Sequence, residues 1–186
     1  PGILLGLLEE SVPKSQVDMM TLVRATKALS SEMNLDELVN EMMKLLITHS
    51  GAHRGIYFLV QPDNQLLVLA EGNIQRTQVD TLCAESFVTW SGDCPRSLIN
   101  YTCNTKQMLI YDSVQDNPFS TDMYFETSDT QSLMSIPVLK NNEFKGILYL
   151  ESTLKCAFST KQVEFMRILT SQLALMLENA KFSALL

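Results

Sequence analysis

The chain has 186 residues, of which 46% are hydrophobic and 19% charged, and its 14 basic and 21 acidic residues give a net charge of −7. A chain of this length predicts one domain with one or two flanking helices, because a single core of this size already buries most of its unfolded surface. No stretch combines Lys and Arg with aromatic residues into a basic stripe, which argues against a nucleic-acid partner.

Targeting and metal-binding patterns are also missing from the sequence. The apolar opening from Ile3 to Leu8 is too short for a membrane span. It also lacks the basic segment that precedes the apolar part of a signal peptide. The four cysteines, Cys83, Cys94, Cys103 and Cys156, show neither a CxxC pair nor a zinc spacing. We therefore expect a reduced, cytoplasmic protein with no metal site.

Helical patterns dominate the first part of the chain. Residues 1–16 are expected to form an upstream linker, and residues 17–31 place apolar side chains at nearly helical spacing. Asn34, with Glu37 three residues later, has the pattern of a capping box. The apolar face that follows predicts a buried helix ending near Ser50.

Strand patterns then follow. Residues 55–60 and 65–72 predict a hairpin, whereas residues 73–90 lack a clear period and are expected to be mixed helix and loop. Pro95 suits the first turn of a short helix, which Asp93 or Cys94 would cap and whose exposed amides suit an anion. Residues 107–112 predict another strand, and the polar, aromatic-rich loop after it has the length and irregularity of a functional loop.

Two strands and a long helix complete the predicted elements. The strands at 132–139 and 143–151 are joined by a two-residue turn, and Pro137 is expected at an edge or a bulge because it donates no hydrogen bond. Ser159 and Gln162 form a second capping box, at the start of a helix that spans 159–185.

The final helix has apolar side chains on two sides. One side, from Val163 to Ala180, is sufficient to cover a sheet. The other includes Ile168, Leu175 and Phe182, which we expect to contact the same helix of a second copy. The sequence therefore predicts a homodimer.

The order of these elements resembles the GAF sensory domains, in particular those upstream of histidine kinase modules in large bacterial signalling proteins. The similar segments are ATKALSSEMNLDELVNEMMKLLITHSGAHRGIYFLV, CPRSLINYTCNTKQMLIYDS, SLMSIPVLKNNEFKGILYLES and FSTKQVEFMRILTSQLALMLENAKFSALL. The resemblance covers residues 20–186 and assigns 17–186 to one GAF-like domain. It implies an α+β fold with an antiparallel sheet of about six strands, terminal helices on one face and a ligand cavity on the other.

A ligand in such a cavity would lie between the helix at 95–103, the strand ending at Asp112 and the aromatic loop. The side chains with most to offer it are Ser97, Asn100, Tyr101, Asp112, Phe119, Tyr124 and Ser135. For each residue alone, a structural role is the more common outcome. Arg96 is expected to be solvated.

Catalytic patterns are weak. Glu151 and Asp112 end strands, but neither His49 nor His53 belongs to a motif beside them, and the GxSxG, HExxH and phosphate-loop motifs are absent. GAF domains that bind cyclic nucleotides or bilins have residue sets that this sequence does not reproduce. The cofactor, if any, is unknown.

We therefore expect a non-catalytic sensory domain of a larger signal-transduction protein, linked covalently to an output domain and binding an unidentified small molecule. Two alternatives stay open. The cysteines from Cys83 to Cys103 suggest a free methionine sulfoxide reductase, and Cys94, at a helix start, is expected to have a lowered pKa. The second alternative is a ligand-free dimerisation spacer.

Overall fold

The computed structural model describes residues 35–74 and 82–185. Its elements are α3 (Leu35–Ser50), β1 (Arg54–Val60), β2 (Leu66–Asn73), β3 (Leu82–Ser86), α4 (Arg96–Thr105), β4 (Leu109–Tyr111), the 3₁₀ helix η1 (Val114–Asp116), α5 (Tyr124–Thr127), β5 (Ser132–Lys140), β6 (Glu143–Ser152) and α6 (Thr160–Leu185). The linker expected at 1–16, the helix expected at 17–31 and the cap expected at Asn34 lie outside the described residues.

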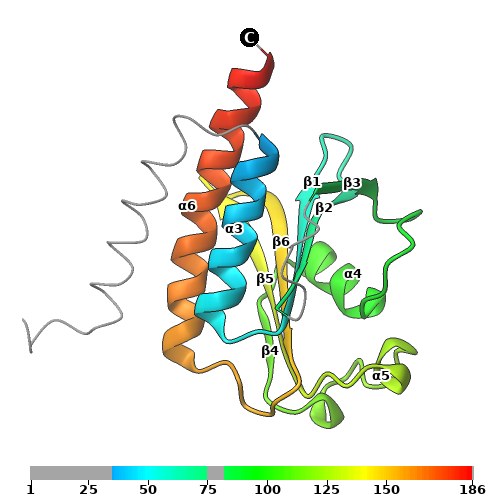
Figure 1. The fold of residues 1–186 in the computed structure, drawn as a ribbon. Helices are drawn as coiled ribbons and strands as arrows, with labels where there is room; N and C mark the ends of the chain where they lie inside the picture. Colours follow the sequence, from blue (N-terminus) through cyan, green and yellow to red (C-terminus); the bar gives the residue numbers. More distant parts are fainter. Residues whose placement is uncertain (1–34, 75–81, 186) are drawn as a thin grey trace, which may run out of the picture.

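The strands form one sheet in the order β3-β2-β1-β6-β5-β4, and every neighbouring pair is antiparallel. Two helices, α3 and α6, lie side by side over one face, whereas α4 lies over the other (Figure 1). The loop that contains α5 extends beyond one end of the sheet, below α4 in this view. The predicted α+β architecture with about six antiparallel strands is confirmed.

Both predicted hairpins are present, and local sequence explains their turns. Asn141 and Asn142 between β5 and β6 have φ of 52° and 62°, the left-handed conformation that asparagine tolerates. Pro137 pairs with Ile147 of β6, two residues past Ser135, where the pairing of β5 with β4 ends. A residue without an N–H therefore lies where β5 has lost its outer neighbour.

The prediction for residues 73–90 was wrong in part, because β3 pairs with β2 inside that stretch. This strand has five residues, lies at the edge of the sheet and has an irregular register between Val68 and Ala70. Within it, Ala84 has a φ of 47°, which extended strands do not have. A short, kinked edge strand lacks the apolar alternation that would have revealed it.

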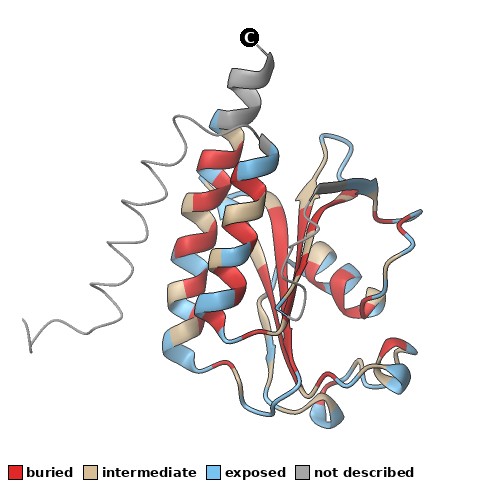
Figure 2. Cartoon of the chain, in the orientation of Figure 1, coloured by how far each residue is buried: buried red, intermediate tan, exposed pale blue. Residues whose placement is uncertain are grey.

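The alternation of side chains along the central strands divides the core into two clusters, one on each face of the sheet. Tyr57 packs under α3 and α6, whereas Ile56 and Phe58 point to the α4 face. Buried residues accordingly line both faces of the sheet (Figure 2). The strands β1 and β6 are therefore covered on both sides, which explains the apolar runs at 55–60 in β1 and 146–150 in β6.

The long helix α6 begins at the predicted capping box. The backbone N–H of Gln162 donates to Ser159 Oγ at 3.3 Å, and the backbone N–H of Ser159 donates to Gln162 Oε1 at 3.1 Å. Its apolar side from Val163 to Leu177 is buried against the sheet and α3. On the other side Ile168 and Leu175 are 45% and 37% exposed in the single chain. The side chain of Phe182 is not among those described.

Candidate functional site

A buried polar cluster lies on the α4 face at the end of the central strands. Arg54, the first residue of β1, donates through Nη1 to Glu151 Oε1 at 3.1 Å and to Tyr124 Oη at 3.1 Å. Its Nη2 donates to the carbonyl oxygen of Asp93 at 2.6 Å, and its Nε donates to Glu71 Oε1 at 2.9 Å. One guanidinium thus connects three strands, the segment before α4 and α5.

Glu151 is the acceptor at the centre of this cluster and is only 2% exposed. Tyr124 Oη lies 2.7 and 2.6 Å from its two carboxylate oxygens, and Tyr149 Oη donates to Oε2 at 2.6 Å. His53 Nε2 lies 3.7 Å from Oε1. Because two phenols and a guanidinium already donate to this carboxylate, its geometry suits a structural tie between the α5 loop and the sheet. We call Arg54, Glu71, Glu151, Tyr124 and Tyr149 the Arg54 network.

The electrostatics of the Arg54 network keep its donors protonated. Burial raises the pKa of Tyr124 and of Tyr149 above the usual phenol value, and the charge of Glu151 raises both further. For Arg54, burial lowers the pKa, but Glu151, Tyr124 and Glu71 more than offset it and the net change is upward. Both phenols therefore act as hydrogen-bond donors to the Glu151 carboxylate.

The first turn of α4 is occupied by a carboxylate of the chain itself. The backbone N–H of Ser97 donates to Asp122 Oδ2 at 3.0 Å, and Ser97 Oγ donates to the same oxygen. The other oxygen, Oδ1, accepts the backbone N–H of Tyr124 at 3.1 Å. The expected anion site at this helix is thus occupied by Asp122. The residue before the helix is Pro95, which provides no side-chain cap, so the prediction of a cap at Asp93 or Cys94 was wrong.

Arg96 was expected to be solvated, but its guanidinium instead holds the turn before α4. Its Nη1 donates to the carbonyl oxygen of Phe87 at 2.7 Å, and its Nη2 donates to that of Trp90 at 2.8 Å. The guanidinium carbon also lies 4.7 Å from the centre of the Phe87 ring. These contacts satisfy the carbonyls of a turn that has no regular partner strand.

The expected low pKa of Cys94 was also wrong. Its side chain is 2% exposed, and burial raises the pKa of its thiol to about 12, although Arg96 and Arg54 act in the opposite direction. Desolvation therefore outweighs the nearby positive charges. Burial likewise raises the pKa of Cys103, whereas Cys156 is exposed. The side chain of Cys83 is not among those described.

Most of the predicted ligand residues lie on the α4 face. Tyr101 is 40% exposed, and its ring centre is 5.3 Å from that of Phe119. Ser135 is buried and its hydroxyl is 2.8 Å from that of Thr102 in α4. Asn100 is exposed.

Three of the seven predicted ligand residues, Ser97, Tyr124 and Asp112, are placed less favourably for binding a ligand. Ser97 and Tyr124 already have the internal partners described above. Asp112 lies apart from the others, in a hollow of about 230 Å³ beside the start of α6 with Met108, Ile110 and Glu164. The structure therefore brings Tyr101 and Phe119 together at the surface and leaves Asp112 on the opposite face.

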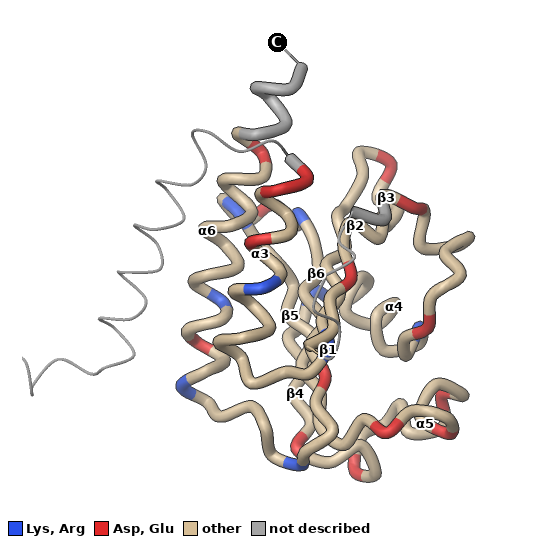
Figure 3. The backbone as a smooth tube through the Cα atoms, in the orientation of Figure 1, with Lys and Arg blue, Asp and Glu red and all other residues tan. Residues whose placement is uncertain are grey.

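The loop around α5 gives the rim of this face a negative charge. Residues 113–139 contain four acidic residues, Asp116, Asp122, Glu126 and Asp129, and no Lys or Arg. Acidic positions accordingly cluster around α5, as Figure 3 shows. A ligand that enters beside this loop meets a negative potential, which disfavours anions.

Sequence reasoning missed the Arg54 network and Asp122. Strand alternation places Arg54 on the same face as Ile56, but its pairing with Glu151 depends on the register between β1 and β6.

Among the side chains that the structure describes, no three His, Cys, Asp or Glu residues are grouped to hold a metal ion. None of the described helices combines the length and apolar character that a membrane span needs.

Comparison with known proteins gives the family. A family model of the GAF domain matches residues 32–178. Hybrid signal transduction histidine kinase G of Dictyostelium discoideum is 33% identical over 87 residues, which are 46% of this chain and 2% of that protein. The chain thus spans about a fiftieth of the length of this relative.

Two solved structures illustrate the range of proteins with this fold. The phycoerythrobilin-bound GAF domain of a cyanobacterial phytochrome has a TM-score of 0.67 at 14% identity, over 91% of this chain and 99% of that one. Free methionine-R-sulfoxide reductase of Neisseria meningitidis, in complex with its substrate, has a TM-score of 0.58 at 13% identity, over 93% and 95%. At these identities the likeness to solved structures shows the fold alone. The family model covers most of the chain and shows its family: the chain belongs to the GAF domain family.

Proposed function

We propose that this GAF domain is a non-catalytic sensory module of a larger cytoplasmic signal-transduction protein. The observation that supports it most directly is the segment shared with a hybrid signal transduction histidine kinase. The module takes a small molecule on the α4 face and passes the signal through α6 to a covalently linked output domain. The two faces are connected because β1 and β6 contribute side chains to both clusters.

The α5 loop is the part of the proposed sensor that responds. It is tied to the sheet by Tyr124 on Glu151 and to α4 by Asp122 on Ser97. A molecule that binds at Tyr101 and Phe119 lies against the same loop and shifts its population between tied and released states. The negative rim favours a ligand that is neutral or cationic, with an aromatic or apolar body.

A thermal-shift screen of the chain against neutral and cationic metabolites tests ligand binding, because a molecule that binds only the folded state raises the unfolding temperature. Hits on the α4 face should lose affinity in the Tyr101→Ala variant and keep it in the surface variant Leu154→Ala, whose side chain is 70% exposed and lies outside the α5 loop. If no compound shifts the transition, the ligand-free spacer becomes the better explanation.

Dimerisation through α6 is the second part of the proposal. The exposed apolar side chains of Ile168 and Leu175 support it, because burying them against a second copy removes apolar area from water. Light scattering during gel filtration should show a dimer that dissociates in the Ile168→Glu, Leu175→Glu double variant. The exposed Lys155, which precedes α6, offers a control, Lys155→Glu, which should stay dimeric. A monomeric parent chain at high micromolar concentration contradicts the proposal.

The reductase alternative is disfavoured by the buried, protonated thiol of Cys94. Turnover of free methionine sulfoxide, measured for the parent chain and for Cys83→Ser, Cys94→Ser and Cys103→Ser, separates the two functions. Activity that disappears in one of these variants contradicts a non-catalytic domain. We expect the parent chain to show no turnover above that of these variants.

A further inference from the structure

A second cavity lies on the α6 face, away from α4. Its volume is about 650 Å³, within the range of about 300–1,000 Å³ that small-molecule sites occupy. It is bounded by the β1–β2 hairpin, the start of β6 and the later turns of α6, and its lining residues are Tyr57, Leu59, Val60, Gln61, Pro62, Asn64, Phe144, Lys145, Ala174, Leu177 and Glu178. We call it the α6-face cavity.

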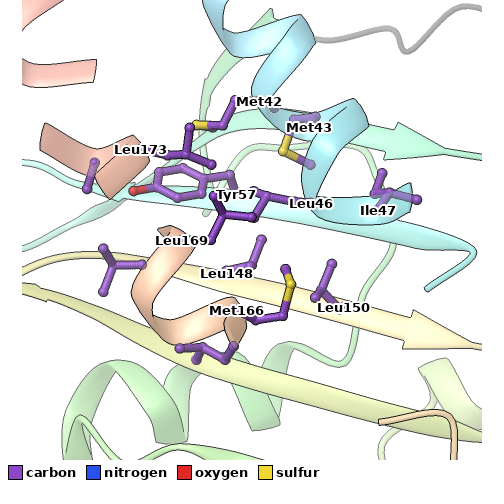
Figure 4. Packing of buried hydrophobic residues seen from close by; sticks show 14 of the residues in the cluster. Met42, Met43, Leu46, Ile47, Tyr57, Leu148, Leu150, Met166, Leu169 and Leu173 are labelled. Atoms are coloured by element: carbon purple, nitrogen blue, oxygen red, sulfur yellow. The ribbon is translucent and has the colours of Figure 1, made fainter. Parts of the chain in front are cut away.

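Tyr57 gives this cavity an unused hydrogen-bond donor. Its side chain is fully buried, and its hydroxyl has no hydrogen-bond partner among the described residues. The ring lies between the sheet and α6, with its hydroxyl directed away from Ile47 and past Leu173 (Figure 4). Leaving a buried hydroxyl unpaired is costly, so a molecule that accepts its hydrogen bond gains from a donor already desolvated.

The position of this hydroxyl depends on Gly146. A Cβ at residue 146 would lie 3.3 Å from Tyr57 Oη and only 2.4 Å from the carbonyl oxygen of Phe58. The missing side chain therefore leaves the space into which the Tyr57 ring extends. Burial raises the pKa of Tyr57, and Glu178 raises it further, so the phenol is a donor throughout the physiological pH range.

The charges at the cavity balance one another. Lys145 Nζ lies 3.2 Å from Glu178 Oε1 and 2.9 Å from Glu143 Oε2, and Lys140 also pairs with Glu178. A charged ligand would have to compete with these pairs, whereas an uncharged one leaves them intact. The side chains of Lys145 and Glu178 are 33% and 30% exposed, so they have solvent into which to move.

We propose that the α6-face cavity binds an uncharged small molecule with an apolar body and a carbonyl oxygen that accepts the hydrogen bond of Tyr57. The apolar body contacts Leu59, Ala174 and Leu177, and the carbonyl reaches Tyr57 Oη as the ion-paired side chains of Lys145 and Glu178 shift together. Because three residues of α6 line the cavity, this ligand touches that helix directly. The site is separate from the one proposed on the α4 face and does not depend on it.

The test uses two probes of similar shape, 4-phenyl-2-butanone, which has a carbonyl, and butylbenzene, which has none. Their binding to the full chain is measured by NMR titration. We expect the ketone to bind more tightly to the parent chain, and Tyr57→Phe to weaken the ketone about fivefold to tenfold while leaving butylbenzene unchanged. Tyr111→Phe, on the α4 face, is the matched control and should bind both probes as the parent does.

A second variant keeps the test independent of Tyr57. Leu177→Trp adds bulk to the cavity wall and should weaken both probes at least tenfold while the chain stays folded. Tyr57→Phe should unfold at the parent's temperature or above it, because the lost hydroxyl has no partner in the described part of the chain. Failure of both probes to bind the parent chain overturns the site, and equal ketone affinity in the parent and Tyr57→Phe overturns the role of the phenol.

Discussion

Replacing Glu151 with Gln tests the Arg54 network at the residue that accepts most of its hydrogen bonds. The amide has nearly the size of the carboxylate, but it has no charge and brings an N–H₂ donor into a group of donors. Tyr124 and Tyr149 then compete for one carbonyl oxygen, and Arg54 keeps Glu71 as its carboxylate partner. We expect the variant to fold with much lower stability.

The magnitude follows from burial. Removing one partner of a buried ion pair costs about 3–5 kcal/mol, because the remaining charge loses its compensation. Glu71, whose side chain is 33% exposed, still pairs with Arg54, so we expect the lower end of that range. For a domain of this size, a loss of about 3 kcal/mol lowers the unfolding temperature by about 6–12 °C.

Urea unfolding followed by tryptophan fluorescence measures this loss, since the chain has one tryptophan, Trp90, and its side chain is buried on the α4 face. The control is Glu143→Gln, on the same strand, where the carboxylate is 71% exposed and its pair with Lys145 is worth less than about 1 kcal/mol. A loss below 1 kcal/mol for Glu151→Gln would refute the reasoning, because it would mean that the buried carboxylate is not the acceptor that holds the network.

Three further predictions test other features. Gly146→Ala should cost about 1–3 kcal/mol in urea unfolding, because the new Cβ would lie 2.4 Å from a backbone oxygen that cannot easily give way; an unchanged midpoint contradicts this. Iodoacetamide at pH 8, followed by mass spectrometry, should label the exposed Cys156 far faster than Cys94, since the rise of the Cys94 pKa from 9.0 to about 12 lowers its thiolate fraction about a thousandfold; comparable rates would refute its burial. The hydrogen bond from Lys140 lowers the pKa of Glu178 below its usual 4.5, so the stabilisation from Glu178 is present above pH 4.5 and is lost as the pH falls through the lowered folded-state value. Between pH 7 and pH 3 the parent chain should therefore lose more stability than Glu178→Gln, and equal losses would contradict the pairing.

Much of the fold was accessible from local sequence patterns. The capping box of Ser159 and Gln162 fixed the start of α6, and the two-residue turn at Asn141 identified the second hairpin. These features depend on residues a few positions apart, so one sequence is enough to recognise them. The edge strand β3 was missed because its kink at Ala84 removes the regular alternation that periodicity detects.

The candidate site was less accessible, because its chemistry depends on residues that are distant in the sequence. Arg54 and Glu151 meet through strand register, 97 positions apart, and Asp122 reaches Ser97 across 25 positions. The pKa of Cys94 was predicted in the wrong direction because a helix start is visible in the sequence, whereas the depth of burial is not. The hydroxyl of Tyr57, which has no partner within residues 35–74 and 82–185, gives no sequence signal, since most buried tyrosines find a partner.

The antiparallel packing of α3 and α6 has a mechanical consequence. The first turn of α3 and the last turns of α6 lie at the same end of the domain (Figure 1). Tension applied between those two points would separate the helices turn by turn from that end. The strands would bear no force until the helices had separated. Unzipping breaks contacts in succession, so we expect the domain to yield at a low force and at that end first.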